Sequence, residues 1–512
     1  MQSTWRMKGA VLVAMACAWQ LPTIARADRT WNNLGTVAGD WNNAQLWTPA
    51  GVPGSTDDVT IPAKATLSPV SKSSGDSTIR SLVLGGDLTI SGGSVQVTNS
   101  LSLSFGDLTL GDGTNAAALA ADGKATSFIV SSGTFTHQGG DLLATGGASI
   151  LVSTPTILRG RSGGTTNISA VNAGKLGLTG VTQVIGQSTA QTVIKADGGT
   201  IDISSVSQPI QGNVQFVAQG TSGLMNIPSG GSGWKLQVRN NGALNIDGTG
   251  NAAFSKSTIA LEDANVFFGT DETRALAIAA DSKLQITAAF PLSQVSTIYG
   301  GLKNHGQVDL GPYSELHLQY GFQQYADGKL TLHLYDDVPG NTSSAGPVLG
   351  IINGGPGTEI SLAGHLTIDS TLSHLPLGYE RTIMFATEPI VGRFDTVSGM
   401  AQANGLYFVP VYYPEVGAVT LVATLGGDAN HDNLVDGVDY TVWADHFLTS
   451  RQTWTTGDFT GDSKVDGADY TLWSDHFAPH TGLSTAVVPE PATGVLAAIA
   501  LLVLFSTRLI RR

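Results

Sequence analysis

LVLGGDLTISGGSVQVTNSLSLSFGDLTL, which spans residues 82–110, consists of short segments in which apolar and polar side chains alternate. Such alternation is typical of β-strands with one buried face. The tetrapeptide Asp87-Leu-Thr-Ile90 returns 20 residues later as Asp107-Leu-Thr-Leu110. Apolar pairs recur every six or seven residues, at Leu82/Leu84, Leu88/Ile90, Val95/Val97, Leu101/Leu103 and Leu108/Leu110. Three short strands per turn of about 20 residues indicate a parallel β-helix, whose stacked turns share one core.

The repeat extends from this stretch towards both ends of the chain. It continues more loosely to about residue 290. Before it, Trp31, Trp41 and Trp47 concentrate aromatic side chains where a cap would cover the unpaired strand edges of the first turn. We therefore expect an N-terminal cap and a β-solenoid over residues 28–290. The opening resembles the start of many bacterial β-helical surface proteins, including those with passenger-type repeats.

Residues 291–425 have a different texture, with longer strands that are richer in aromatic residues and are separated by glycine turns. The expected strands are Glu315–Tyr320, Lys329–Tyr335, Gly364–Ile368, Thr382–Ala386, Leu406–Tyr413 and Ala418–Val422. Both an antiparallel β-sandwich and a terminal part of the solenoid fit this pattern. The last strands resemble a module that often closes β-helical envelope proteins.

The composition excludes several classes of protein. Of the 512 residues only 13% are charged, while 64 are glycine, which disfavours helical bundles and coiled coils. The chain has 26 basic and 40 acidic residues, a net charge of -14, so a nucleic-acid partner is not expected. The single cysteine, Cys17, lies in the N-terminal leader. A processed chain would therefore depend on its core, or on bound metal, rather than on disulfides.

The N-terminus has the features of a secretory signal peptide over residues 1–27. A basic start precedes the apolar run Ala10–Trp19, and a small-x-small site ends at Ala27. We expect cleavage between Ala27 and Asp28. A lipoprotein signal at Cys17 is the alternative. Both interpretations predict export.

The C-terminal linker and tail, residues 481–512, contain Pro489-Glu490-Pro491, the apolar run Gly494–Phe505 and a final cluster of arginines. Such a run predicts a short transmembrane helix with a cytoplasmic basic end. The three parts in this order resemble the PEP-CTERM sorting signal of bacterial envelope proteins. The resemblance implies processing by an exosortase-type membrane enzyme, followed by release or attachment at the surface. A simple C-terminal anchor helix is the alternative.

Residues 427–447 and 457–477 repeat each other with an offset of 30. Each repeat places oxygen-bearing residues at positions 1, 3, 5, 7, 9 and 12 of a loop, where position 7 offers its backbone carbonyl. Ca²⁺ takes about six to eight oxygen ligands, and such a loop supplies them. The predicted ligands are Asp428, Asn430, Asp432, Leu434, Asp436 and Asp439 in the first loop, and Asp458, Thr460, Asp462, Lys464, Asp466 and Asp469 in the second. The sequence therefore predicts two calcium sites.

Each loop leads into a short helix with three aromatic residues on one face. These residues are Tyr440, Trp443 and Phe447 in the first helix and Tyr470, Trp473 and Phe477 in the second. Because the helices can pack on each other only when the loops are folded, metal binding should stabilise the fold. This pair of half-EF-hands resembles the type I dockerin domain over residues 426–480. The resemblance implies a small α-helical calcium domain.

The sequence departs from the dockerin pattern in three ways. Loop position 6 holds Asn433 and Ser463 where glycine is common. Thr460 replaces an Asn or Asp ligand, so the second site should be the weaker one. Positions 10 and 11, which in dockerins often contact a cohesin, hold Gly437-Val438 and Gly467-Ala468. Calcium binding therefore carries over to this chain better than cohesin binding does.

Dockerins are often attached to polysaccharide hydrolases and lyases, so an enzyme must be weighed. Adjacent acidic pairs stand at Asp57/Asp58, Glu262/Asp263 and Asp336/Asp337. Neighbours on a strand point to opposite faces, so these acids fit turns better than a catalytic pair. Ser162 lies in a nucleophile-elbow pattern, but a poor helix-forming segment follows it. His317 and His333 fit exposed strand positions.

The sequence thus favours an exported cell-surface or matrix protein with a structural, adhesive or partner-docking role. The alternative is a carbohydrate-active enzyme, a hydrolase or lyase, whose site lies on the solenoid or in residues 291–425. As a third possibility, the dockerin-like domain docks a cohesin-like partner. A polysaccharide is a further possible ligand of the rod. The sequence supplies no convincing set of catalytic residues.

Overall fold

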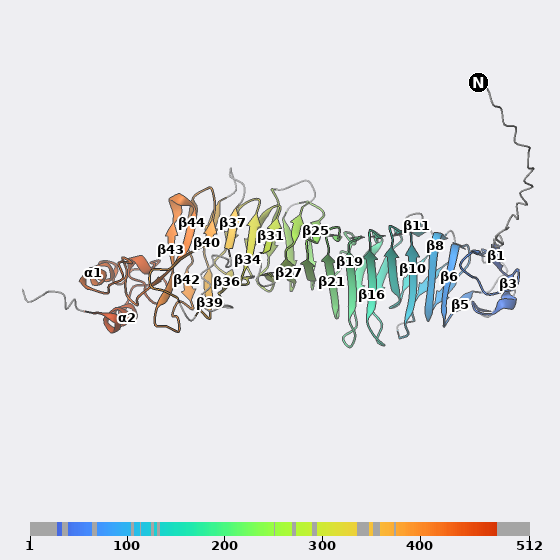
Figure 1. Ribbon diagram of the computed structural model, residues 1–512, viewed down its shortest axis with the longest axis horizontal. Helices are drawn as coiled ribbons and strands as arrows, with labels where there is room; N and C mark the ends of the chain where they lie inside the picture. The colour runs from blue at the N-terminus through green and yellow to red at the C-terminus, as the bar shows by residue number, and fades with distance from the viewer. Residues whose placement is uncertain are drawn as a thin grey trace, which may run out of the picture.

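The computed structural model describes residues 28–32, 39–63, 69–103, 107–112, 114–123, 127–130, 134–249, 251–268, 273–288, 294–334, 348–351, 359–372 and 375–478. Within these ranges the chain is mainly β and forms a long rod, with two short α-helices at its C-terminal end (Figure 1). The strands run across the rod, and each turn of the chain supplies up to three of them. Each strand pairs in parallel with its equivalent one turn later, which is consistent with the predicted β-helix.

Face 1 of the rod contains the N-terminal halves of β6 (Asp76–Leu84) and β8 (Gly93–Leu103). They are followed by β10 (Ala117–Asp122), β13 (Asp141–Thr145), β16 (Thr166–Val171), β19 (Thr192–Asp197), β21 (Val214–Gln219), β24 (Lys235–Arg239), β27 (Thr258–Glu262), β30 (Lys283–Thr287), β33 (Gln307–Leu310), β36 (Lys329–Leu334), β39 (His365–Ser370) and β42 (Thr396–Ser398). All successive pairs on this face are parallel.

Face 2 begins with β1 (Asp28–Trp31) and β4 (Asp58–Ile61) and includes the C-terminal halves of β6 and β8. It continues through β11 (Ser127–Val130), β14 (Ser149–Val152), β17 (Lys175–Gly177), β20 (Thr200–Asp202), β22 (Leu224–Ile227), β25 (Ala243–Ile246), β28 (Asn265–Phe267), β31 (Gln294–Ile298), β34 (Ser314–Leu318), β37 (Val348–Ile351) and β40 (Glu380–Phe385). These strands are also parallel to their neighbours.

Face 3 is built from shorter strands in separate sheets. They are β2 (Gly39–Asp40), β5 (Val70–Lys72), β7 (Leu88–Ile90), β9 (Leu108–Leu110), β12 (Phe135–His137), β15 (Thr156–Arg159), β18 (Val181–Ile185), β23 (Gly230–Ser232), β26 (Ala252–Ser255), β29 (Ala275–Ile278), β32 (Gly301–Asn304), β35 (Phe322–Gln324), β38 (Ile360–Leu362) and β41 (Ile390–Gly392). The strands predicted within residues 82–110 thus fall on all three faces, and their alternation is confirmed.

The parallel pairing continues beyond residue 290. The structure therefore has the terminal-solenoid arrangement rather than a separate sandwich, because β33, β36, β39 and β42 extend face 1 without a break. The end differs from the rest. Strands β43 (Tyr407–Tyr413) and β44 (Ala418–Thr424) form an antiparallel hairpin around the 3-10 turn Pro414–Val416, and β44 pairs antiparallel with β40.

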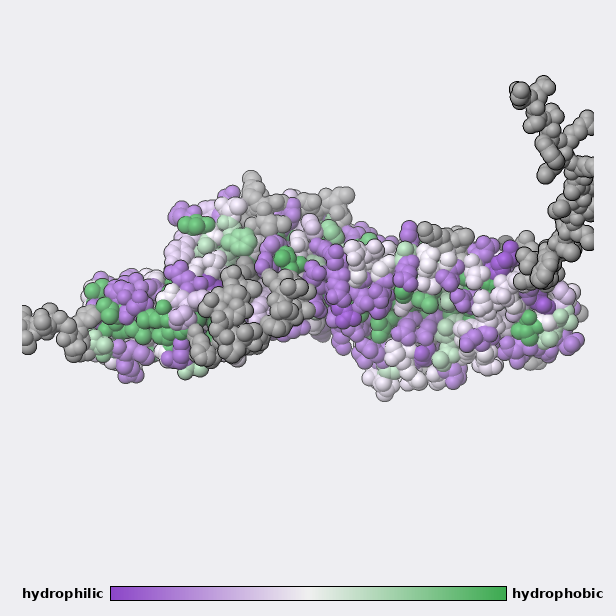
Figure 2. Space-filling model, in the orientation of Figure 1, coloured by the Kyte–Doolittle hydropathy of each residue, from purple (hydrophilic) through white to green (hydrophobic). Residues whose placement is uncertain are grey.

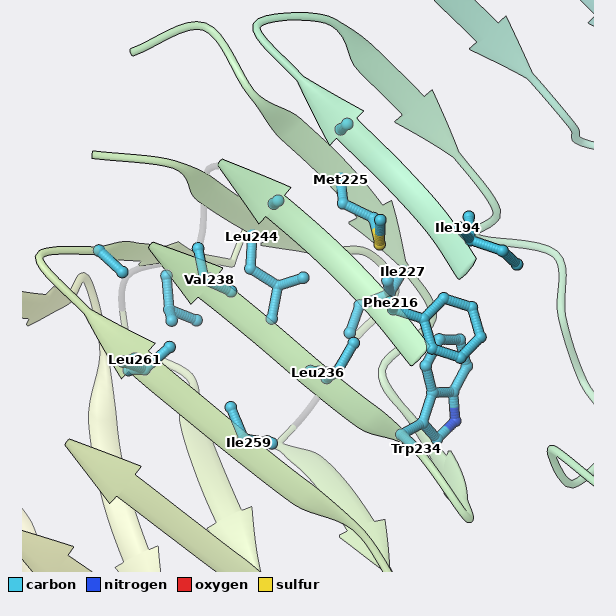
Figure 3. Packing of buried hydrophobic residues seen from close by; sticks show 14 of the residues in the cluster. Ile194, Phe216, Met225, Ile227, Trp234, Leu236, Val238, Leu244, Ile259 and Leu261 are labelled. Carbon is cyan, nitrogen blue, oxygen red and sulfur yellow. The ribbon is translucent and has the colours of Figure 1, made fainter. Parts of the chain in front are cut away.

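The core is a continuous apolar column inside the rod. On face 1 each inward side chain stacks on its equivalent in the next turn, as Ile194, Phe216 and Leu236 do. Figure 3 shows these residues with the ring of Trp234, whose centroid lies 4.6 Å from that of Phe216. Since neighbouring strands lie about 4.8 Å apart, every turn fills the space above the one before it.

Three tryptophans fill the N-terminal end of the column, as the sequence predicts. Trp31, Trp41 and Trp47 are each at most 1% exposed, and the centroids of successive rings are 4.9 and 5.0 Å apart. The strand β3 (Trp47–Thr48) pairs antiparallel with β1, after the 3-10 turn Ala44–Leu46. The antiparallel strand and the aromatic cluster together close this end of the rod.

One buried histidine makes rod stability depend on pH. His137 on β12 donates from Nε2 to the Gly140 carbonyl (2.7 Å) and accepts the Arg159 N–H at Nδ1 (3.2 Å), so only the neutral ring satisfies both contacts. Burial lowers the pKa of His137 from 6.5 to about 4. The lowered pKa supplies stability above pH 6.5 that is lost as the pH falls towards 4.

We expect this loss to reach about 3 kcal/mol, from about 1.4 kcal/mol per unit of pKa difference. Urea unfolding of the protein and of His137→Gln across that pH range measures it. The variant should lack this part of the pH dependence. His305→Gln, which changes a partly exposed histidine just after β32, should retain it. Equal pH dependence in all three proteins would contradict the assignment.

No helix in the described part of the chain is long and apolar enough to cross a membrane. The predicted signal peptide up to Ala27, the Pro489-Glu490-Pro491 triplet and the predicted membrane helix lie outside the described residues. Asp28, the expected first residue after cleavage, is the first residue of β1.

Candidate metal centre

The two predicted calcium loops end at helices α1 (Gly437–His446) and α2 (Gly467–His476). Each helix starts with an aspartate cap. Asp436 and Asp466 accept the N–H of Val438 and Ala468 at 2.7 and 2.8 Å, respectively. Three residues after each cap, Asp439 and Asp469 accept the backbone N–H of the capping residue at 2.9 and 2.8 Å. These reciprocal bonds fix where each helix begins.

In the first loop, positions 1 and 12 are brought together and turned inward. Asp428 Oδ2 accepts the Thr424 hydroxyl (2.7 Å) and the Asn433 N–H (3.0 Å). Asp439 Oδ1 accepts the N–H of Ala429 at 2.8 Å, so the last position of the loop is bonded to its second. The loop is thereby closed around the side chains of its two ends.

The second loop repeats this geometry. Asp458 accepts the N–H of Gly461 and Ser463 at 2.9 and 2.8 Å, and Asp469 accepts the Thr460 N–H at 2.9 Å. Asn433 and Ser463, which stand at position 6 where glycine is common, have φ of 70° and 67°. Position 6 therefore needs the left-handed conformation in both loops, which explains the usual glycine.

The remaining predicted ligands stand at the surface around these buried acids. Asn430, Asp432 and Leu434 of the first loop are exposed, and Asp436 is half-buried. In the second loop the equivalent residues Thr460, Asp462, Lys464 and Asp466 have the same pattern of exposure. Asp432 and Asp462 are engaged by the backbone N–H two residues later, at 2.9 Å each.

Four carboxylates are buried in this small region, and no Lys or Arg in the described part of the chain pairs with any of them; burial lowers the pKa of the neighbouring His431. Asp428, Asp439 and Asp469 are 0% exposed and Asp458 is 4% exposed. Burial raises the pKa of Asp439 and of Asp469, and raises the pKa of Asp458 to about 7. Asp428 Oδ1 is buried with no hydrogen-bond partner. Buried charge of one sign is costly unless a counter-charge is supplied.

The donor set of each loop fits a hard cation. Carboxylate, amide, hydroxyl and carbonyl oxygens are the ligands Ca²⁺ prefers. In the described ranges, no three His, Cys, Asp or Glu side chains lie close enough together to surround an ion. Position 3 offers an amide or hydroxyl oxygen and position 7 a backbone carbonyl in addition to these acids. Ca²⁺ binding would require the exposed carboxylate at position 5 and the half-buried carboxylate at position 9 to turn towards the buried pair.

The six predicted aromatic residues of the helices form one cluster across the α1–α2 contact. Tyr440 lies 5.2 Å from Trp473, and Trp443 lies 5.1 Å from Tyr470, measured between ring centroids. The cluster is not fully buried, since Tyr440 and Tyr470 are each 42% exposed. Figure 2 shows hydrophobic residues at the surface of this end of the molecule.

The module formed by residues 426–478 is docked on the last turns of the rod. Val397 of β42 donates its N–H to the Gly461 carbonyl at 2.8 Å, and the Ser463 hydroxyl donates to the Asp395 carbonyl. Trp454, in the 3-10 turn Trp454–Thr456, packs on Tyr407 of β43 with ring centroids 5.3 Å apart. The apolar core of the rod thus continues into the module.

Both predicted calcium loops take part in this contact. Asp428 is bonded to Thr424, the last residue of β44. Asp458 lines a small space of about 20 Å³ between the module and the rod, together with Tyr412 and Trp454. The Trp454 indole also donates to the Asp428 carbonyl at 2.6 Å. Folding of the loops and closure of the rod therefore involve the same residues.

The other candidate residues are dispersed. Ser162 lies in a turn between β15 and β16, so no helix follows it and an elbow does not form. Asp57 is bound by Arg29, and Asp58 by Arg80. Glu262 ends β27, while Asp336 and Asp337 lie outside the described residues. His317 pairs with Glu315 on the same strand (3.3 Å).

One cluster of titratable side chains, around His333, was not predicted from the sequence. His333 on face 1 lies between two carboxylates, with Nδ1 2.7 Å from Asp369 and Nε2 3.9 Å from Asp309. Lys283 Nζ is 2.5 Å from the same Asp309 carboxylate. These residues come from four successive turns, so only knowledge of the strand register could have brought them together.

The two loops therefore share buried acids, backbone conformation and helix caps, and both contact the rod. In both loops the acid at position 12 accepts the backbone N–H of the acid at position 9. No family model matches the chain, and neither a curated protein nor a solved structure is similar to it.

Proposed function

We propose that this protein is an exported, rod-shaped surface or matrix protein, with a parallel β-helix closed at its C-terminus by a module that binds two Ca²⁺. Its role would be structural or adhesive. The observation that carries the proposal is the set of four buried carboxylates, which stand at positions 1 and 12 of two similar loops that contact the rod. Two divalent cations would balance the charge.

The residues that would hold the ions are the predicted ones. In the first loop they are Asp428, Asn430, Asp432, the Leu434 carbonyl, Asp436 and Asp439; in the second they are Asp458, Thr460, Asp462, the Lys464 carbonyl, Asp466 and Asp469. Ca²⁺ would supply positive charge to the buried acids and join the two ends of each loop. The second site would be weaker, because the Thr460 hydroxyl is a poorer ligand than the Asn430 amide oxygen.

We propose that the rod works outside the cytoplasm, on the basis of the predicted sorting signals. A leader ending at Ala27 would direct export, and the segment around Pro489-Glu490-Pro491 would be processed by an exosortase-type enzyme. The membrane would hold the chain at least until that step. The partner at the surface would be a polysaccharide or a cohesin-like protein. A polysaccharide lying along the rod would not need the contacts that dockerins make with a cohesin at loop positions 10 and 11.

Calorimetric titration of the mature protein tests the calcium proposal. We expect about two Ca²⁺ per chain, and about one after either Asp428→Ala/Asp439→Ala or Asp458→Ala/Asp469→Ala. Asp112→Ala, which removes an exposed turn acid of the rod, should bind like the original protein. Thr460→Asn should tighten the second site. Absence of binding in the folded protein, or an unchanged stoichiometry in both double variants, would refute the proposal.

The His333 cluster favours a second candidate, a carbohydrate-active enzyme acting on face 1. The carboxylates of Asp309 and Asp369 flank one imidazole, and two carboxyl groups within about 10 Å can serve glycoside hydrolysis. Release of reducing ends from a polysaccharide panel, abolished by Asp309→Asn, would favour this candidate over a binding role.

A further inference from the structure

Face 1 carries a row of outward-facing residues that contains cations and no acid over eight successive turns. The strand register aligns Gln215, Lys235, Thr258, Lys283, Gln307, Lys329, His365 and Thr396. We call this set the basic row. It stands out in a chain whose net charge is -14. Figure 2 shows a largely hydrophilic surface across the middle of the rod.

The lysines of the basic row are evenly spaced. Lys235, Lys283 and Lys329 lie on β24, β30 and β36, so one turn without a lysine separates each from the next. With strands about 4.8 Å apart, successive lysines are separated by about 9.6 Å. This is close to the length of two linked sugar rings. A polysaccharide with one carboxylate in every second sugar would match the charges.

The surface around Lys235 is hollowed and lined with amides. Lys235, Gln215 and Thr258 border a depression of about 330 Å³. Gln191 donates to Gln215 (2.7 Å), and Gln215 donates to Gln237 (3.0 Å), so these side chains are held in a ladder. Fixed amides and a hydroxyl beside a cation suit the hydroxyl groups of a sugar.

Further along the row, a buried acid positions a lysine and a hydroxyl lacks a partner. Asp309, only 6% exposed, holds Lys283 Nζ at 2.5 Å and the Gln307 amide at 2.8 Å. Thr331, two residues after Lys329 on β36 and aligned with Asp309, is also 6% exposed, and its hydroxyl has no partner in the described structure. A buried hydroxyl without a partner is unfavourable, and a ligand oxygen would satisfy it.

We propose that the basic row is a binding track for a linear uronate polysaccharide that lies along the rod. Its carboxylates would face Lys235, Lys283 and Lys329, and its hydroxyls would face the amide ladder. The inference deepens the proposed surface role and rests on it. The acids on face 1 beside these turns stand outside the basic row, Asp309 in the next outward row and Glu262 and Asp369 in the one after it, so the carboxylates of the ligand would lie over the lysines.

The test uses the mature protein with calcium and two soluble glycans, the glucuronate polymer hyaluronan and neutral dextran. We expect hyaluronan to bind at about 50 mM salt and to be released at about 0.5 M, where charges are screened within a few ångströms. Lys235→Gln/Lys283→Gln/Lys329→Gln should bind about tenfold more weakly. Lys175→Gln/Lys256→Gln/Lys303→Gln, with the same change of charge at sites outside the row, should bind normally.

Three results with the glycans would overturn the track: no binding of hyaluronan, an equal loss of hyaluronan binding in both triple variants, or capture of dextran as strong as that of hyaluronan. Single-stranded DNA of matched charge is included, and tighter capture of DNA than of hyaluronan would also overturn it. Calcium stoichiometry and thermal unfolding are measured on the same samples. A protein that binds two Ca²⁺ but no glycan would disprove the track and leave the proposed rod and its closure intact.

Discussion

Chelation of calcium will speed amide hydrogen exchange in β42, β43 and β44 together with exchange in α1 and α2, while β19 and β21 in the middle of the rod stay protected. The reason is that the module and the last turns share hydrogen bonds and one apolar core. Val397 is bonded to Gly461, and Thr424 to Asp428. Loosening the loops therefore exposes the end of the rod.

The expected change is large. An ion present at about a thousand times its dissociation constant stabilises the bound state by about 4 kcal/mol. Amides that exchange through opening of the module should thus exchange about a thousandfold faster after chelation. Because a solenoid is stabilised mainly by contacts between neighbouring turns, the effect should fade towards the middle. If the helices lose protection and β42–β44 do not, the module is merely tethered to the rod.

The stabilisation by calcium should also depend on pH. The raised pKa of Asp458 means that the metal-free fold binds more protons than the unfolded chain between pH 3.8 and about 7. Stability without calcium therefore falls as the pH rises through this window. Calcium needs the ionised carboxylates, so its contribution grows in the same direction. The difference between loaded and chelated protein should be larger above pH 7 than at about pH 5.

The parts of the fold that follow from local pattern were predictable. Alternating apolar residues with a turn of about 20 residues indicated the solenoid, because each strand buries one face. The terminal part was harder to interpret. The first residues of β33, β36, β39 and β42 are 307, 329, 365 and 396, so the spacing rises from 22 to 36 and 31. Because the turns differ in length, the repeat cannot be recognised from residue spacing, although the strand pairing on face 1 shows it clearly.

At the candidate site, too, the local features could be predicted from the sequence and the long-range contacts could not. The spacing of Asp428 and Asp439 is enough to predict a loop, since the ligands are close in sequence. The contact between the loops and the rod could not be predicted from the sequence. The hydrogen bond between Val397 and Gly461 of the second loop, for example, joins segments 64 residues apart, and no periodic pattern in the sequence links them. The sequence also implied that the aromatic residues of the helices bury each other, whereas Tyr440 remains 42% exposed.

Trp454→Ala will uncouple the module from the rod and lower the stability of the calcium-loaded protein by about 3–5 kcal/mol, as expected for a buried tryptophan. Trp454 is 3% exposed and packs between Tyr407 of the rod and Phe459 of the second loop, at 5.3 and 5.2 Å. Its indole N–H also holds the Asp428 carbonyl. Calcium binding to the first loop should therefore weaken as well. Thermal unfolding and calorimetric titration measure the two effects.

Trp443→Ala is the matched control, because Trp443 has the same size and lies in the same module. It is only partly buried, its ring packs on Phe447 and Tyr470, and its indole N–H donates to the Asp466 carbonyl at 3.0 Å, so its ring contacts lie within the module. Its removal should loosen the helix pair and leave exchange in β43 unchanged. A double-mutant cycle of Trp454→Ala with Tyr407→Ala should give a coupling of about 0.5–3 kcal/mol. If this coupling is absent, or both tryptophans protect β43 equally, the module does not close the rod through Trp454.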